Sequence, residues 1–156
     1  MHTALLLAFA IGFVAGLRSM TAPAALSWAA YLGWRSLEGS FLSFMGSGIT
    51  VTIFSTLALV EYITDLLPST PNRTAAGPLL VRVLMGGLTG AGLALSAQQH
   101  STLGAIAGGV GAVVGAFAGY AARRQLVSGL KIRDALIAIP EDLLAIALAY
   151  LIVSGS

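Results

Sequence analysis

The amino-acid sequence predicts an all-α membrane protein, a bundle of helices that crosses the bilayer five or six times. Of its 156 residues, 57% are hydrophobic and only 9% are charged, whereas a soluble domain carries about 25% charged residues. The mean hydropathy is +0.91. So little charge cannot cover a surface in water, and at about 20 residues per crossing the chain holds five or six spans. We expect a single transmembrane domain, residues 1–156, with no separate soluble domain.

Charges, prolines and polar clusters separate six apolar segments, which cover residues 3–17, 22–34, 47–67, 78–97, 103–122 and 135–153. The second segment is the weakest candidate, because it would rise only about 20 Å as a helix, short of a hydrocarbon core of about 30 Å. We expect it to be a short tilted span, a re-entrant segment or an interfacial helix. Its Trp28, Tyr31 and Trp34 fit an aromatic belt at a membrane boundary.

Prolines are expected to shape two of these segments. Pro68 and Pro71 should end the third helix, and Pro140 should interrupt the sixth.

The basic residues indicate how the chain is oriented in the membrane. With six crossings and both termini outside, only Arg35 lies on the outer face. With five crossings, Arg18 joins Arg35 outside. Because short cytoplasmic loops carry the excess of basic residues, six crossings are favoured. The basic residues at the inner face are then Arg18, Arg73, Arg82, Arg123, Arg124, Lys131 and Arg133. They sit at the ends of apolar runs rather than in a stripe, so nucleic acid is not an expected partner.

Glycines recur mostly at four-residue spacings, which puts those of each segment on one helix face. Small residues let two helix backbones approach closely in lipid. The segment 103–122 is therefore expected to be a central packing helix or the subunit interface of a homo-oligomer; equally, its glycines could pack helices only within one chain. The glycines concerned are Gly12, Gly16, Gly86, Gly90, Gly104, Gly108, Gly111, Gly115 and Gly119.

Ionisable residues inside or beside the apolar runs are expected to have a structural or functional role, because a charge at a helix centre costs about 2.5–3.5 kcal/mol on insertion scales. Asp65 lies one helical turn after Glu61. Both topologies place the acids and Arg82 near the cytoplasmic face, and six crossings add Arg18, the natural partner for Glu61 or Glu141. The candidate binding residues are Arg18, Glu61, Asp65, Arg82, Glu141 and Asp142.

Two interpretations of these charges stay open. A carboxylate beside an arginine in apolar surroundings is the setting for a proton- or cation-coupled site. Alternatively, Glu61 and Glu141 pair with Arg18 and Arg82 to lock helices together, while Asp65 and Asp142 reach the head groups. Hydroxyl groups of the third segment could line a pore, but such groups commonly bond to the carbonyls of their own helix. They belong to Thr50, Thr52, Ser55 and Thr56.

Other chemistry is not expected. The chain has no cysteine, which excludes disulfides and thiolate metal sites, and His2 and His100 lie in a terminus and a loop. We find no phosphate loop, nucleophile elbow or haem-attachment motif, so we expect no cofactor, no metal site and no enzymatic activity. A metal-dependent lipid enzyme is disfavoured because Glu141 and Asp142 point about 100° apart on a helix.

Three motifs together resemble a known group of proteins. They are Gly16–Pro23 (GLRSMTAP), Glu61–Pro68 (EYITDLLP) and Pro140–Ala147 (PEDLLAIA). These are similar to the small bacterial membrane proteins of domain of unknown function 4126. The resemblance implies a location in the bacterial inner membrane and marks Arg18 and the four acids as positions of interest, but it implies no substrate.

These observations lead to two functional hypotheses. The first is a transporter or channel for an ion or small solute, with Glu61 and Glu141 as binding carboxylates and Arg18 and Arg82 as their counter-charges. The alternative is a non-transporting scaffold or accessory subunit that assembles through the glycine faces.

Overall fold

The computed structural model describes residues 2–66, 74–130 and 134–155, and its described residues form helices, turns and loops without a strand. The predicted all-helical fold is therefore confirmed. In chain order the elements are α1 (His2–Leu17), α2 (Thr21–Tyr31), the 3-10 helix η1 (Ser43–Gly46), α3 (Gly48–Thr64), α4 (Ala76–Ser96), α5 (Ser101–Leu130) and α6 (Asp134–Ser154).

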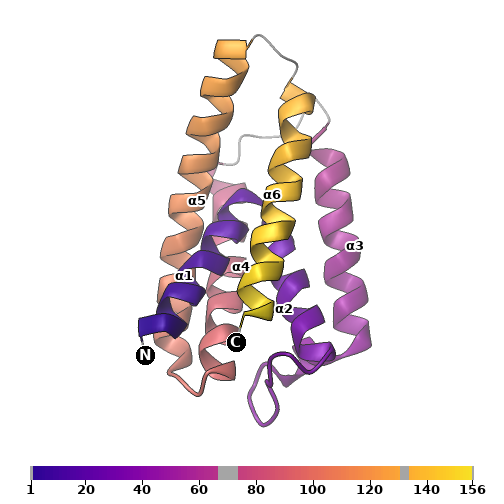
Figure 1. The fold of residues 1–156 in the computed structure, drawn as a ribbon, viewed down its shortest axis with the longest axis vertical. Coiled ribbons are helices and arrows are strands. Elements are labelled where there is room, and N and C mark those ends of the chain that lie inside the picture. The colour runs from indigo at the N-terminus through magenta and orange to yellow at the C-terminus, as the bar shows by residue number, and fades with distance from the viewer. Residues whose placement is uncertain (1, 67–73, 131–133, 156) are drawn as a thin grey trace.

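Successive α-helices alternate in direction along the long axis of the molecule (Figure 1). Helices α1, α3 and α5 run away from the end that holds both chain termini, and α2, α4 and α6 run back toward it. We call this end of the molecule the termini end. The turn that joins α1 to α2 consequently lies within the bundle, on the same side as the end of α3 and the start of α6.

Among the described residues, three helical stretches are long and apolar enough to cross a membrane: Ala76–Ser96, Ser101–Gly129 and Ile137–Ser154. Helices α1 and α3 are apolar but shorter, with 16 and 17 residues, and α2 has only 11. The chain is thus a membrane protein by composition and helix length, and the sequence correctly singled out its second segment as short.

Two helices differ from the sequence prediction. Helix α5 continues past residue 122 through Arg123 and Arg124, because a charge ends an apolar run without ending a helix, and arginine is a good helix former. Helix α6 runs unbroken through Pro140, so the expected interruption is wrong; proline removes only one hydrogen bond of the helix, and neighbouring groups in a bundle compensate for such a loss. Pro68 and Pro71 lie outside the described residues.

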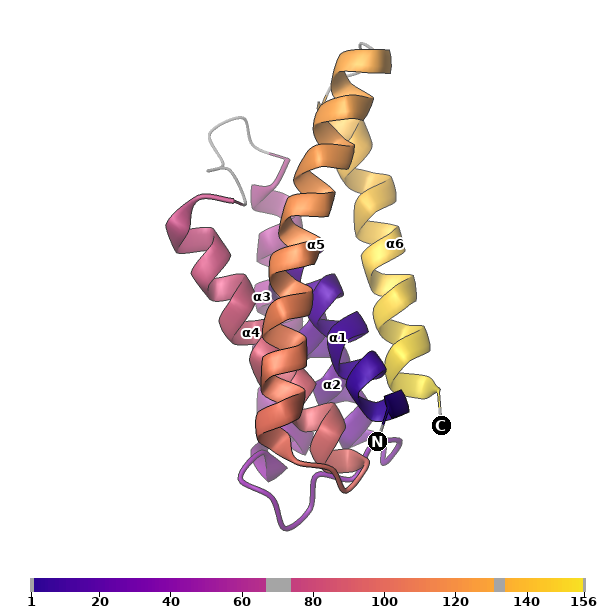
Figure 2. The ribbon, with the colours of Figure 1, turned by 90° about the vertical axis from the view of Figure 1, so that its left-hand side faces the viewer.

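Helix α5 lies along one edge of the bundle in Figure 1 and packs most extensively on α1 and α4. Figure 2 shows α5 between α4 and α1, with α6 beyond α1. Helix α2 packs on α3 and α6. The buried side chains of the core cluster come from α1, α2, α4, α5 and α6, from η1 and from the loop before it. Ile11, Val14, Leu26 and Met45 are among them.

Glycines let the backbones of α1, α4 and α5 approach one another. A Cβ atom on Gly12 would lie 2.0 Å from the carbonyl oxygen of Gly108, and one on Gly108 would lie 2.0 Å from that of Gly86. On the same face of α5, a Cβ atom on Gly115 would lie 2.2 Å from the carbonyl oxygen of Phe13. Close backbone contact also involves Gly16, Gly90, Gly104 and Gly111, and Gly119 is buried. These glycine faces therefore contact helices of the same chain.

Candidate functional site: a buried ion-pair cluster

Arg18 lies at the centre of a cluster of charged residues inside the bundle. It directly follows α1, where its backbone nitrogen donates to the carbonyl oxygen of Val14 at 2.8 Å, and its side chain is fully buried, with 0% exposure. Its Nη1 donates a hydrogen bond to Asp65 at the end of α3. Its Nε lies 2.5 Å from Oδ1 of Asp142 in α6, and its Nη2 lies 4.0 Å from Oε2 of Glu141. One guanidinium thus joins the α1–α2 turn to two other helices.

The Arg18–Asp142 contact is an ion pair without a well-directed hydrogen bond. Both Arg18 Nε and Asp142 Oδ1 are buried, and neither has a hydrogen-bond partner of good geometry among the described residues. Two opposite charges in contact attract each other strongly where water is excluded. The Nε–H group of Arg18 nevertheless still lacks a well-aligned hydrogen-bond acceptor among the described residues.

Arg123 of α5 is a second arginine of the cluster. Its Nη1 donates to Oδ2 of Asp65 at 2.9 Å and lies 3.7 Å from Oε2 of Glu141. Asp65 therefore bridges two guanidinium groups. From the sequence, Arg123 is predicted only to help orient the chain in the membrane. It nevertheless continues the four-residue spacing of Gly111, Gly115 and Gly119, which places it on the packing face of α5.

Glu61 holds the turn between α1 and α2. Its Oε1 accepts hydrogen bonds from the backbone nitrogen and the hydroxyl of Ser19, both at 2.8 Å, and its Oε2 accepts one from the backbone nitrogen of Met20 at 2.9 Å. Met20 is the N-cap residue of α2 and forms no side-chain cap of its own. The first N–H groups of a helix lack partners within the helix. The carboxylate of Glu61 in α3 accepts hydrogen bonds from such N–H groups at the start of α2, where negative charge is also favoured by the helix dipole.

Arg82 connects α4 to the same turn. It is 6% exposed, its Nε donates to the carbonyl oxygen of Gly16 at 3.0 Å, and its Nη2 lies 3.6 Å from Oε1 of Glu61. The structure thus brings all six predicted site residues into one connected group. With Arg123 added, we call this group the ion-pair cluster: Arg18, Glu61, Asp65, Arg82, Arg123, Glu141 and Asp142.

The pairing inside the cluster agrees only in part with what the sequence suggested. Glu61 pairs with Arg82, and Glu141 lies 4.0 Å from Arg18, as one interpretation expected. The two carboxylate oxygens of Glu61 also accept hydrogen bonds from the backbone of the α1–α2 turn. Asp65 and Asp142 are the close partners of Arg18, so the interpretation in which these two acids only reach the head groups is wrong. The physical reason is the place of Arg18 on the α1–α2 turn, from which its long side chain points toward the end of α3 and the first turns of α6.

Tyr62 separates the ion-pair cluster from an apolar groove. Its ring lies over Arg18, with 6.0 Å between the ring centroid and Cζ, and its hydroxyl is 2.6 Å from the hydroxyl of Thr21, with which it shares a hydrogen bond. A lysine or arginine near an aromatic face is attracted by the ring. Nothing in the sequence distinguished Tyr62 from other apolar-helix tyrosines, because its role depends on where α2 and α3 meet.

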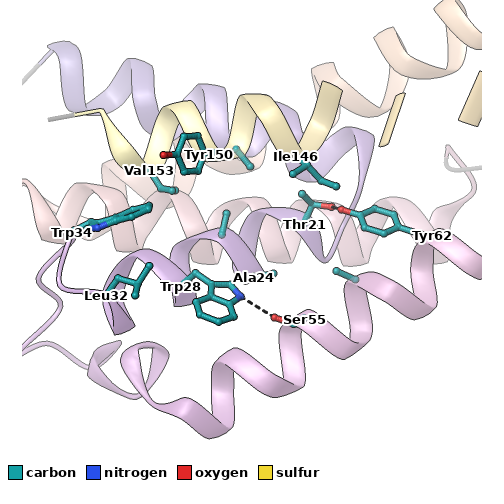
Figure 3. Close-up of a pocket in the computed structure, with 13 residues that line it drawn as sticks. Thr21, Ala24, Trp28, Leu32, Trp34, Ser55, Tyr62, Ile146, Tyr150 and Val153 are labelled. Carbon is teal, nitrogen blue, oxygen red and sulfur yellow. Dashed lines mark hydrogen bonds between the residues drawn. The ribbon is translucent and has the colours of Figure 1, made fainter. Parts of the chain in front are cut away.

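Beyond Tyr62 a groove of about 420 Å³ runs along α2, between α3 and α6. Figure 3 shows Thr21 and Tyr62 at one end of this groove and Trp34, Leu32 and Val153 at the other. We call it the lateral groove. Near its middle, Nε1 of Trp28 donates to the hydroxyl of Ser55 at 3.0 Å.

The threonine hydroxyl groups of α3 are bonded to nearby backbone carbonyl oxygens. Thr52 and Thr56 donate to the carbonyl oxygens of Gly48 and Thr52, each at 2.8 Å, and both side chains are exposed. Thr50 donates to the carbonyl oxygen of Phe44 at 2.9 Å. The sequence left two alternatives for these hydroxyl groups, lining a pore or bonding to nearby carbonyl oxygens. The hydrogen bonds of Thr50, Thr52 and Thr56 are of the second kind.

Arg35 lies apart from the cluster, in the loop after α2. Its Nε and Nη2 donate to the carbonyl oxygens of Val153 at 2.9 Å and Ile152 at 3.2 Å, and Nη2 also donates to that of Gly155. Burial lowers the pKa of Arg35, but a guanidinium stays charged in proteins. A cation near the last carbonyls of a helix satisfies them and interacts favourably with the helix dipole, so Arg35 anchors the end of α6.

The comparison with known families agrees with the motifs around this cluster. Residues 5–154 match the family described as domain of unknown function (DUF4126). The chain belongs to the DUF4126 family. This match confirms the resemblance carried by the three motifs, all of which lie within the matched residues. No curated protein and no solved structure matches this DUF4126 chain. Among the described residues there is also no group of three or more metal-ligating side chains placed to hold a metal ion.

Proposed function

We propose that this chain is an inner-membrane transporter or channel for an ion or small solute, and that the ion-pair cluster is its binding and coupling site. The observation that supports the proposal most directly is the complete burial of Arg18 in contact with acids from two other helices. An ionisable group at membrane depth is a functional-site hypothesis by default.

Helix lengths support a position of the ion-pair cluster inside the hydrocarbon region. The exposed Tyr31 and Trp34 at the termini end suit one membrane boundary. From that end, the 16 residues of α1 rise about 24 Å to Arg18, and α6 rises about 20 Å between Ser154 and Glu141. These rises are taken along the helix axes, and in a core of about 30 Å they support a position for the cluster between the middle of the core and the opposite boundary. This geometry corresponds to the six-crossing topology, in which the cluster lies toward the cytoplasm.

Stability alone does not account for such a cluster. Replacing a buried ion pair by apolar residues of similar volume is often neutral or stabilising, and lipid makes charge still more costly. A proton or cation that neutralises Asp142 would weaken the closest contact between Arg18 and α6 and leave only the longer one to Glu141. This exchange would couple binding of the ion to a movement of α6.

Flux across liposome membranes tests the proposal. We expect the wild-type chain to conduct at least one member of a panel of ions and small solutes. Asp142→Asn, Glu61→Gln and Glu141→Gln should each lower the rate at least tenfold. Glu38→Gln is the matched control, because Glu38 is exposed in a loop away from the cluster. Absence of flux for the whole panel, or equal flux in all four variants, would refute transport through this site.

The scaffold alternative predicts that leucine at Gly111, Gly115 or Gly119 breaks assembly between subunits. In the structure Gly111 and Gly115 face the backbone of α1 in the same chain. These substitutions are therefore expected to unfold the single chain rather than to separate intact subunits. Release of folded monomers by Gly115→Leu would favour the scaffold, and loss of the fold would remove its proposed interface.

A further inference from the structure

The lateral groove is open between α3 and α6, with α2 as its floor (Figure 3). Helices α3 and α6 both pack on α2 but make little contact with each other. The small side chains that line the groove, including Ala24, Ala58 and Ala149, leave the space between α3 and α6 above α2 unfilled. The groove therefore faces outward, toward whatever surrounds the bundle at this level.

Water is a poor occupant of the lateral groove. Its lining is almost wholly apolar, and its main polar groups already bond to one another, Thr21 to Tyr62 and Trp28 to Ser55. A bound water needs two to four polar partners. An empty groove would also forfeit the dispersion contacts of its lining atoms. An apolar occupant satisfies both conditions.

The length of the lateral groove matches one leaflet of a bilayer. Helix α2, which forms its floor, has 11 residues and rises about 16 Å, half of a hydrocarbon core of about 30 Å. At the termini end of the groove, the rings of Trp34 and Tyr150 stand edge to face with centroids 5.8 Å apart. Tryptophan and tyrosine favour the level of the head groups, whereas the inner end lies against Thr21 and Tyr62.

We propose that the lateral groove binds one acyl chain of a phospholipid from the leaflet at the termini end. The head group lies beside Trp34 and Tyr150, and the end of the acyl chain reaches the Thr21–Tyr62 hydroxyl pair. A helix about 16 Å long and 10 Å across fills about 1,250 Å³, so it could only lie across the mouth of a groove of about 420 Å³, whereas a single acyl chain can lie inside it. This site goes beyond the proposed function and does not depend on transport.

Fluorescence quenching by a brominated lipid tests this proposal. The chain has two tryptophans, Trp28 and Trp34, and both line the groove. The full chain in detergent micelles is titrated with phosphatidylcholine that carries bromine atoms on an acyl chain. We expect quenching that saturates at about one lipid per chain, and one retained phosphatidylcholine in native mass spectra.

Two variants of α6 give a matched comparison. Ile146 lines the groove and is 45% exposed, whereas Leu144 is 55% exposed on the same helix and does not line it. Because both positions are exposed, phenylalanine at either should leave the fold intact, which circular dichroism checks. Ile146→Phe should raise the lipid concentration at half-quenching at least tenfold, and Leu144→Phe should leave it unchanged.

Several outcomes would overturn the lipid site. Quenching that rises without saturation, and equally in the wild type and both variants, would mean that lipid only surrounds the bundle. Absence of quenching together with a stable dimer would mean that a second copy covers the groove. Neither outcome bears on the flux assay, so failure of the lipid site and failure of transport are separate results.

Discussion

Replacing Gly108 of α5 with alanine is expected to destabilise the bundle, although alanine is the better helix former. A Cβ atom at this position would lie 2.0 Å from the carbonyl oxygen of Gly86 and 3.0 Å from Cα of Gly90. Comfortable contact between such atoms begins at about 3.5 Å, so α4 and α5 would have to separate locally by up to about 1.5 Å. Both contacts are to helix backbone, and no side chain can rotate away to make room.

The size of the effect follows from two opposing contributions. Forcing an extra methyl group into a packed interface typically costs about 1–3 kcal/mol, while replacing glycine by alanine inside a helix contributes up to about 1 kcal/mol. The neighbouring Gly109 isolates the second contribution, because a Cβ atom there would meet Val83 Cγ1 at 3.7 Å, an ordinary contact. Gly108→Ala should therefore be less stable than Gly109→Ala by about 1–3 kcal/mol.

Reversible unfolding in mixed micelles measures this difference. The fraction of dodecyl sulfate is raised stepwise, and helix content is followed by circular dichroism. Gly129→Ala is a second control, because a Cβ atom at Gly129 meets nothing within 4 Å. Equal unfolding midpoints for Gly108→Ala and Gly109→Ala would refute the close approach of α4 and α5 that the structure describes.

Arginines at two other places give further predictions. Arg18→Gln should lower the free energy of unfolding by about 3–5 kcal/mol, because the buried Oδ1 of Asp142 then lacks its arginine. The exposed Arg124→Gln should change it by less than about 0.5 kcal/mol. Similarly small changes in both variants would argue against a buried ion pair. Arg35→Gln removes charged hydrogen bonds to the carbonyl oxygens at the end of α6, including that of Val153, each worth about 1.5–3 kcal/mol. Amide hydrogen exchange in the last turn of α6 should then accelerate at least tenfold, and an unchanged rate would show that Arg35 does not hold this end.

Much of the helical framework could be predicted from the sequence. Apolar segments of this length in a chain with so few charges have to satisfy their backbone groups internally, which favours helices. The segments 78–97 and 135–153 agree with α4 and α6 to within a few residues. The end of α5 was misplaced at residue 122, because hydropathy reports where lipid contact ends rather than where the helix ends. The predicted interruption of α6 at Pro140 was wrong, since a single proline does not break a helix whose lost hydrogen bond is compensated by neighbouring groups.

Residue composition and order are enough to predict a helical membrane protein whose charged residues must meet partners, because lipid penalises isolated charge. They are also enough to pick out six members of the cluster. Which groups pair could be read only from the folded chain: Glu61 with the backbone of the α1–α2 turn, and Arg18 with Asp65 and Asp142. Those pairings depend on the rotation and depth of each helix, which residue spacing along one helix does not fix. The lateral groove likewise arises from how far apart α3 and α6 stand on α2, a distance set by packing alone.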